Sequence, residues 1–303
     1  MIYSEKMIRL YFHCKVLLIL TLVLLLSCVR DSQAPQPDRE AAVNTNMDIN
    51  LFPEADITLD PGAEASREAF VEDFWRWIFI EAGIPESLSG NVAASALESP
   101  AFVMELLLVL QQDPYTFVLV DKEHALSSAY APGDLVPLTA GSFRVTRDGL
   151  LLRSMAVDPL EEMARAALLD GIILTVGSAY RSYANQRDVN ANWVRQLGQE
   201  AADRISAPAG HSQHQLGLVV DFSPIDPSFA QTPASAWLEE NAGRFGWSLS
   251  YPDGYEDITG YSWESWHYRY VGRDLTLFID RYFGGIQQYA LQFIHTWQLM
   301  SDF

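Results

Sequence analysis

Lysine and cysteine are scarce in this chain of 303 residues, and each scarcity excludes a hydrolytic mechanism. Lysine occurs only at Lys6, Lys15 and Lys122, and no serine lies three residues before Lys122, so a Ser-x-x-Lys acyl-enzyme mechanism is excluded. Cys14 and Cys28 both lie in the N-terminal leader, so the folded part has neither a cysteine nucleophile nor a disulfide. No Gly-x-Ser-x-Gly elbow occurs, although counting alone does not exclude a Ser/His/Asp triad. Hydrolysis by metal-activated water is the mechanism that remains.

Basic residues are also few, with 20 Lys and Arg against 39 Asp and Glu and a net charge of −19. Removing residues 1–27, which hold three basic residues and one acidic residue, gives a net charge of −21. This balance argues against a nucleic-acid partner and against simple electrostatic attachment to anionic lipid or wall polymers. A hydrophobic content of 49% allows one sizeable core with appendages.

Only six histidines are present, and three of them, His211, His214 and His267, lie in or beside two short segments, 212–221 and 264–267. These segments offer His214, Asp221 and His267 as metal ligands, with the carboxylate of Glu264 three residues before the last imidazole. A catalytic zinc site uses three protein ligands of this kind and a nearby carboxylate that moves protons. The alternative is that the histidines are hydrogen-bonded core residues and the acids are surface groups.

The spacing agrees with one shared site. Gly217–Phe222 is typical of a short buried strand, and Trp266–Val271 of a second strand that begins near His267. If these strands pair in antiparallel fashion, His214, Asp221 and His267 meet at one metal.

The same segments resemble the VanY-type D-Ala-D-Ala carboxypeptidases, within the LAS group of zinc peptidases that cut bacterial cell-wall peptides. The resemblance extends from about Phe117 to Asp274, roughly half of the chain. It rests on the Ser-x-His-x6-Asp and Glu-x-x-His pair together with four other segments, 120–136, 178–186, 197–204 and 251–261.

The resemblance implies that His214, Asp221 and His267 bind Zn2+ and that Glu264 is the general base. It also implies that Arg181 and Ser212 contact the substrate. Arg181 could stabilise the oxyanion of a tetrahedral intermediate, or it could form a structural ion pair. Ser212 could donate a hydrogen bond to a terminal carboxylate, or it could only cap the turn before the strand.

Three further residues, Ser178, Tyr180 and Gln186, are candidates for the walls of a substrate pocket. The implied activity is removal of the terminal D-Ala from peptidoglycan stem peptides. An L,D-carboxypeptidase acting on tetrapeptide stems is the near alternative. A catalytically inactive, lipid-anchored wall-binding module is the other, but its mark would be a missing ligand or base, and none is missing.

The N-terminal leader predicts the compartment. Lys6, Arg9 and Lys15 precede an apolar run that ends in Leu25-Leu26-Ser27-Cys28, which is typical of a lipoprotein signal peptide over residues 1–28. Lipidation of Cys28 would anchor the protein to a membrane on the extracytoplasmic side of the cell envelope, at the periplasmic face or the outer membrane in a diderm. An uncleaved N-terminal anchor would give the same side of the membrane.

The rest of the chain predicts four more regions. Residues 29–50 indicate a flexible linker, 51–113 a helical N-terminal extension, 114–275 the catalytic domain and 276–303 a C-terminal helical extension. In the N-terminal extension we expect an amphipathic helix whose apolar residues are Phe70, Phe74, Trp77, Ile78 and Ile80, and a second helix over 101–110. A hairpin is expected over 143–153, around Asp148-Gly149. The fold class is α+β, with a small antiparallel sheet that carries the zinc site, flanking helices and extra N-terminal helices.

Overall fold

The computed structural model describes residues 73, 75–88 and 101–301. The signal peptide, the linker, the first part of the N-terminal extension, and Phe70 and Phe74 lie outside the described residues. No helix in the described ranges is long and apolar enough to cross a membrane.

A five-stranded sheet lies at the centre of the catalytic half, in the order β2-β4-β5-β7-β6. Its strands are β2 (Arg144–Val145), β4 (Thr175–Ser178), β5 (Val219–Phe222), β7 (His267–Tyr270) and β6 (Trp247–Leu249). All neighbours are antiparallel except β2 and β4, which form a parallel pair at one edge. Separately, β1 (Leu135–Pro137) and β3 (Leu151–Arg153) form an antiparallel pair. The α+β class is confirmed, and the sheet is antiparallel around the candidate site.

The hairpin expected over 143–153 does not form. Gly149 does supply a turn, with φ of 77°, but the two flanking segments join different sheets. The first segment bonds to β4 through Arg144 N–H and Thr146 N–H, which donate to Leu174 and Val176 carbonyls. The second segment, β3, pairs with β1. The turn was predicted correctly, but each flanking segment pairs with a strand distant in the sequence and not with the other segment.

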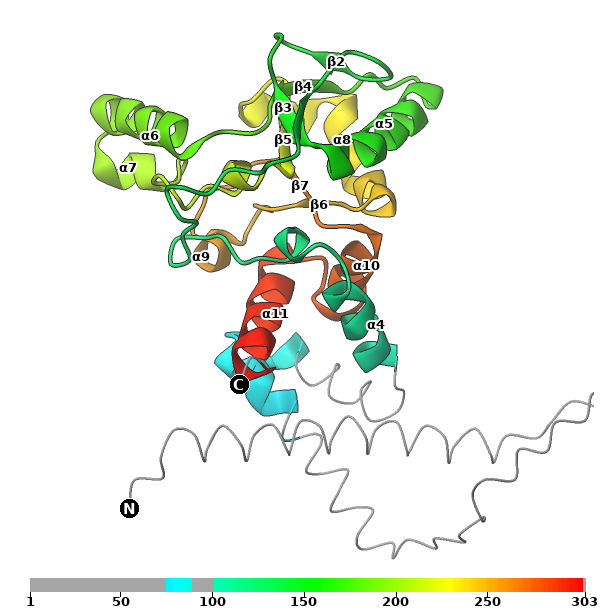
Figure 1. Ribbon diagram of the computed structural model, residues 1–303, viewed down its shortest axis with the longest axis vertical. Coiled ribbons are helices and arrows are strands. Elements are labelled where there is room, and N and C mark those ends of the chain that lie inside the picture. Colours follow the sequence, from blue (N-terminus) through cyan, green and yellow to red (C-terminus); the bar gives the residue numbers. More distant parts are fainter. Residues whose placement is uncertain (1–72, 74, 89–100, 302–303) are drawn as a thin grey trace, which may run out of the picture.

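Helices surround the sheet, with α6 and α7 on one side and α5 and α8 on the other (Figure 1). Their bounds are α5 Ser154–Leu169, α6 Tyr183–Leu197, α7 Gln199–Asp203 and α8 Pro233–Asn241. α5 begins at Ser154 and holds Pro159 in its interior. The apolar sides of α5, α8 and the sheet form one core, which includes Leu160, Met163, Val220, Phe222 and Leu238.

Short helical elements connect these larger ones. They are η1 (Pro114–Thr116), η2 (Gln213–Leu216), η3 (Pro227–Gln231), η4 (Ala242–Phe245) and α9 (Glu256–Thr259).

A second core joins the two ends of the described chain. The expected helix over 101–110 is observed as α4 (Ala101–Leu110), and it packs with α10 (Arg273–Tyr282) and α11 (Gln287–Ser301). The helical segment 75–81 joins the same core, and Trp75 stacks on Trp297 with ring centroids 5.5 Å apart. The N-terminal and C-terminal extensions therefore form one helical unit below the sheet (Figure 1).

The expected apolar face of the segment 75–81 is partly wrong. Trp77 and Ile80 are 39% and 61% exposed, whereas Trp75, Ile78 and Phe79 are fully buried. This segment has apolar residues on more than one side of the helix, so the sequence pattern does not define which side is buried. The side that we predicted is rotated from the side that packs against the core.

Candidate metal centre

The two central strands bring the expected ligands together. Asp221 on β5 lies directly opposite His267, the first residue of β7. His214 lies in η2, and Gly217 turns the chain from η2 into β5 with a φ of 68°. A Cβ atom at Gly217 would lie 2.9 Å from the Leu135 side chain, so both the backbone angle and the space favour glycine here.

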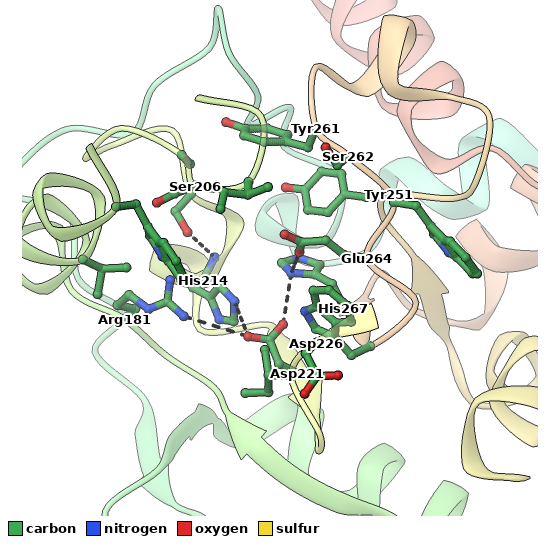
Figure 2. A pocket seen from close by; sticks show the side chains of 18 of the residues that line it. Arg181, Ser206, His214, Asp221, Asp226, Tyr251, Tyr261, Ser262, Glu264 and His267 are labelled. Carbon is green, nitrogen blue, oxygen red and sulfur yellow. Dashed lines mark hydrogen bonds and ion pairs between the residues drawn. The ribbon is translucent and has the colours of Figure 1, made fainter. Parts of the chain in front are cut away.

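The candidate metal centre consists of His214, Asp221 and His267, whose ligand atoms all lie within 4.8 Å of one another (Figure 2). His214 Nε2 is 3.0 Å from Asp221 Oδ2, and His267 Nδ1 is 3.1 Å from Asp221 Oδ1. Two ligands of a tetrahedral zinc ion, each about 2.0–2.1 Å from the metal, lie about 3.3 Å apart. The observed separations are close to that value.

Hydrogen bonds to the other ring nitrogens agree with a metal centre. His214 Nδ1 is 2.7 Å from the carbonyl oxygen of Ala179, and His267 Nε2 is 3.3 Å from Gln213 Oε1. When each of these nitrogens donates, His214 Nε2 and His267 Nδ1 keep free lone pairs that face Asp221. Among the described residues, the buried oxygen Asp221 Oδ1 accepts no well-formed hydrogen bond. An unsatisfied carboxylate oxygen between two imidazole lone pairs fits a bound cation.

The pKa values of the three residues also fit a bound metal cation. Burial lowers the pKa of His214 to about 4, which keeps this ring in the neutral form that a metal ligand requires. Burial also disfavours a charge on His267, but the Asp221 and Glu264 carboxylates beside its ring outweigh burial and raise the pKa of His267 to about 9. The pKa of Asp221 is lowered, because the neighbouring imidazoles outweigh its burial. Around Asp221 and His267 the centre therefore favours a positive charge, and a metal cation bound there would take the place of the His267 proton.

Glu264 lies beside this centre. Its Oε2 is 3.3 Å from His267 Nδ1, and burial raises the pKa of its carboxyl group. Its backbone carbonyl accepts a hydrogen bond from His267 N–H, and its own N–H donates to the carbonyl of Tyr251. These bonds fix a turn that directs the carboxylate toward the cavity from above His267 (Figure 2).

Arg181 approaches from the opposite side of the centre (Figure 2). Its guanidinium donates to Gln186 Oε1 at 2.9 Å and to Ser178 Oγ at 3.1 Å, and it lies 3.9 Å from Asp221. Gln186 is in turn held by a 2.6 Å bond to the carbonyl of Ala207. Neutral acceptors therefore orient this cation, and its ion pair with Asp221 is long.

A cavity of about 430 Å³ opens over these groups. Of the expected substrate contacts, Arg181, Ser212 and Gln186 line it. Ser178 and Tyr180 are not among its lining residues, so Ser178 acts on the cavity only through its bond to Arg181. Ser212 is placed both to contact a substrate and to cap the turn. It lines the cavity, and its side-chain oxygen accepts a hydrogen bond from the backbone N–H of His214.

Sequence reasoning missed the aromatic wall of the cavity. Tyr251, Tyr261, Trp263 and Trp266 line one part of it, and Trp193 of α6 lines another. The Tyr251 ring lies 4.7 Å from that of His267. The density of aromatic residues around Glu264 was the available signal.

The matching family model is VanY: D-alanyl-D-alanine carboxypeptidase, which matches residues 149–273. YodJ of Bacillus subtilis (strain 168), a protein named as a carboxypeptidase, is 34% identical over 196 residues, which cover 60% of this chain and 72% of YodJ. The chain belongs to the VanY family. A D-alanyl-D-alanine carboxypeptidase of Enterococcus faecalis (strain ATCC 700802 / V583) is 29% identical over 63% of this chain and 67% of its own length.

Similar solved structures include both an LD-carboxypeptidase and D,D-peptidases. The LdcB LD-carboxypeptidase is 32% identical with a TM-score of 0.51, over 58% of this chain and 89% of its own. The vancomycin resistance D,D-dipeptidase VanXYg, in complex with a D-Ala-D-Ala phosphinate analog, is 26% identical with a TM-score of 0.52, over 59% and 71%. A mutant of the vancomycin resistance D,D-pentapeptidase VanY in complex with Zn(II) is 28% identical with a TM-score of 0.49, over 58% and 99%. Membership of the family confirms the prediction of a hydrolytic carboxypeptidase.

Proposed function

We propose that this protein is a zinc-dependent D-alanyl-D-alanine carboxypeptidase that removes the terminal D-Ala of peptidoglycan stem peptides. The observation that carries the proposal is the buried group of His214, Asp221 and His267 in one cavity with Glu264 and Arg181. Every residue type that the reaction needs is present, so a binding module without turnover has no support from this site.

His214, Asp221 and His267 would hold the metal, which their donor atoms and orphaned carboxylate oxygen fit. Zinc in such a site polarises a scissile carbonyl and lowers the pKa of water to about 7.

Glu264 is proposed as the general base. Its carboxyl group is buried, lines the cavity and has a raised pKa, so it can take a proton at near-neutral pH and pass it to the leaving amine. Removing water from around this carboxylate also strengthens its hydrogen bonds to the reacting groups.

Arg181 and Ser212 are proposed to bind the anionic groups of substrate and intermediate. Arg181 is the only Arg or Lys among the described residues that line the cavity, so a terminal carboxylate has one permanent cation to approach. Gln186 and Ser178 hold the guanidinium in place, which reduces the entropy lost when it binds. The same cation can stabilise an oxyanion as it develops.

Metal removal tests the proposal directly. Purified protein without its leader should release D-Ala from a synthetic pentapeptide stem, lose this activity on exhaustive chelation and regain it with zinc. Mass spectrometry of the products is the measurement. A second candidate function is L,D-carboxypeptidase activity, which the similarity to LdcB supports. If the protein cleaves tetrapeptide stems and leaves pentapeptide stems intact, this second function replaces the first. Full activity with no metal detected would reject the zinc mechanism.

Substitution of Glu264 by glutamine separates chemistry from metal binding. Glu264→Gln should keep its zinc and lose on the order of 10²-fold or more in kcat, the usual scale for removing a general base. Glu240→Gln, an exposed residue of α8, is the matched control and should behave as wild type. Loss of zinc from Glu264→Gln would make this residue a ligand, and wild-type turnover would place the base elsewhere.

The free chain end of the substrate should decide the rate. A stem peptide amidated at its C-terminus should be cut far more slowly than the free acid, because the amide leaves Arg181 and Ser212 without their charged partner. Comparison of kcat/KM for the two peptides is the measurement. Equal values would indicate an endopeptidase and leave the zinc site standing.

The proposed location is the extracytoplasmic face of a membrane, reached through a lipid on Cys28. Support comes from the basic residues, apolar run and Leu-Leu-Ser-Cys sequence of the leader. Expressed in bacteria, the full chain should incorporate labelled fatty acid and Cys28→Ser should not. Equal labelling of the two would contradict lipidation at this position.

A further inference from the structure

A buried polar network lies behind His267, on the side away from Asp221. His267 Nε2 is 3.3 Å from Gln213 Oε1, and the same amide oxygen accepts a 2.8 Å hydrogen bond from Ser250 Oγ. The single proton of the Ser250 hydroxyl is shared with Gln287 Oε1, which accepts the longer branch of this bifurcated bond at 3.3 Å, and Gln287 Nε2 donates to the carbonyl of Ser248. Gln213 and Gln287 are each 1% exposed and Ser250 is 3% exposed, so water does not compete for these bonds.

The chemistry of the network fixes the state of the His267 ring. An amide oxygen can only accept, so Gln213 Oε1 selects the form of His267 in which Nε2 carries the proton. In the neutral ring that binds a metal, the lone pair is then on Nδ1, which lies 3.1 Å from Asp221 Oδ1. Gln213 therefore controls both the rotation of the ring and which nitrogen is available to a metal.

Gln287 brings the helical unit into this arrangement. It is the first residue of α11, one residue after the turn in which Gly284 and Gly285 have φ of 61° and 79°. The rest of α11 is anchored in the second core by Leu291, Phe293 and Ile294. The VanY family model ends at residue 273, so α11 lies beyond the region that the family model matches.

We propose that Gln213 is the positioning residue for His267, and that Ser250 and Gln287 hold Gln213 in place, so that α11 is part of the support of the metal centre. This inference rests on the zinc site of the proposed function. It assigns a role to a helix that the family model does not match.

The test measures metal binding, independently of peptide hydrolysis, in the otherwise complete protein. Gln213→Met keeps the size of the side chain and removes the acceptor, and it should weaken zinc binding by about 10- to 100-fold. It should also change the visible absorption bands of the cobalt-substituted protein, which report ligand geometry. Gln213→Glu keeps an acceptor oxygen and should restore both the zinc affinity and the cobalt spectrum.

Gln287 contacts Gln213 only through Ser250, so Gln287→Met should have a smaller effect than Gln213→Met. It should weaken zinc binding by about two- to tenfold, the effect of one net hydrogen bond. The matched control is Gln288→Met, on the next residue of α11. Gln288 is also buried, at 4% exposed, but it donates to Asp121 and not to the network. Its substitution should leave zinc affinity and the cobalt spectrum unchanged even if the protein becomes less stable.

Unchanged zinc affinity and an unchanged cobalt spectrum in folded Gln213→Met would overturn the proposal. If Gln213→Met does not fold, Ser250→Ala and Gln287→Met decide by the same two measurements. A wild-type protein that binds no zinc contradicts the proposed function itself. A wild type that binds zinc, with variants that bind it equally well, contradicts only the role of the network.

Discussion

The pairing of Asp221 with His267 across the two central strands is the constraint on which the site depends. These residues face each other in register on β5 and β7, and the backbone bonds of the sheet hold them there. A carboxylate and an imidazole that are each about 3% exposed would be costly to bury if they were not matched. His214 completes the match from η2, which Gly217 turns into the start of β5. A one-residue slip of this register would turn one of the two side chains to the other face of the sheet.

Neighbouring groups then direct each side chain of the site. The carbonyl of Ala179 orients His214, Gln213 faces His267, and Gln186 with Ser178 orients Arg181. All four of these partners are neutral acceptors, so they fix geometry without cancelling the charges that the chemistry uses. The region 178–186 supplies the partners of Arg181, and Ala179 lies in the same region. The short segment that runs from the end of β4 into α6 therefore connects the metal centre to the proposed carboxylate site.

The sequence predicted the parts of this arrangement whose signals are local. Periodicity and apolar runs predicted the two strands that carry Asp221 and His267, and they predicted the bounds of α4. The sequence did not predict which segments pair at long range. The turn at Gly149 was recognised, but its flanking strands join different sheets. Ser250 and Gln213 meet across 37 positions, and Gln213 and His267 across 54, so no local pattern could reveal their contacts. The buried face of segment 75–81 was misjudged because only the packed core distinguishes Phe79 from Trp77.

The net negative charge of the protein would be expected to repel an anionic substrate, but the charges close to the site decide binding. The chain carries a net charge of −19, yet the proposed substrate ends in a carboxylate. Exposed charges more than about 8–10 Å away are largely screened at physiological salt, so the distant acidic surface has little influence inside the cavity. Within the cavity, Arg181 and a metal cation oppose the carboxylates of Asp221 and Glu264 at short range and in a partly dry environment, where charges interact strongly. Selection of an anionic chain end therefore depends on where a single guanidinium is held, and not on the net charge of the protein. That is why the neutral amide and hydroxyl that hold Arg181 matter as much to the proposed function as the charge itself.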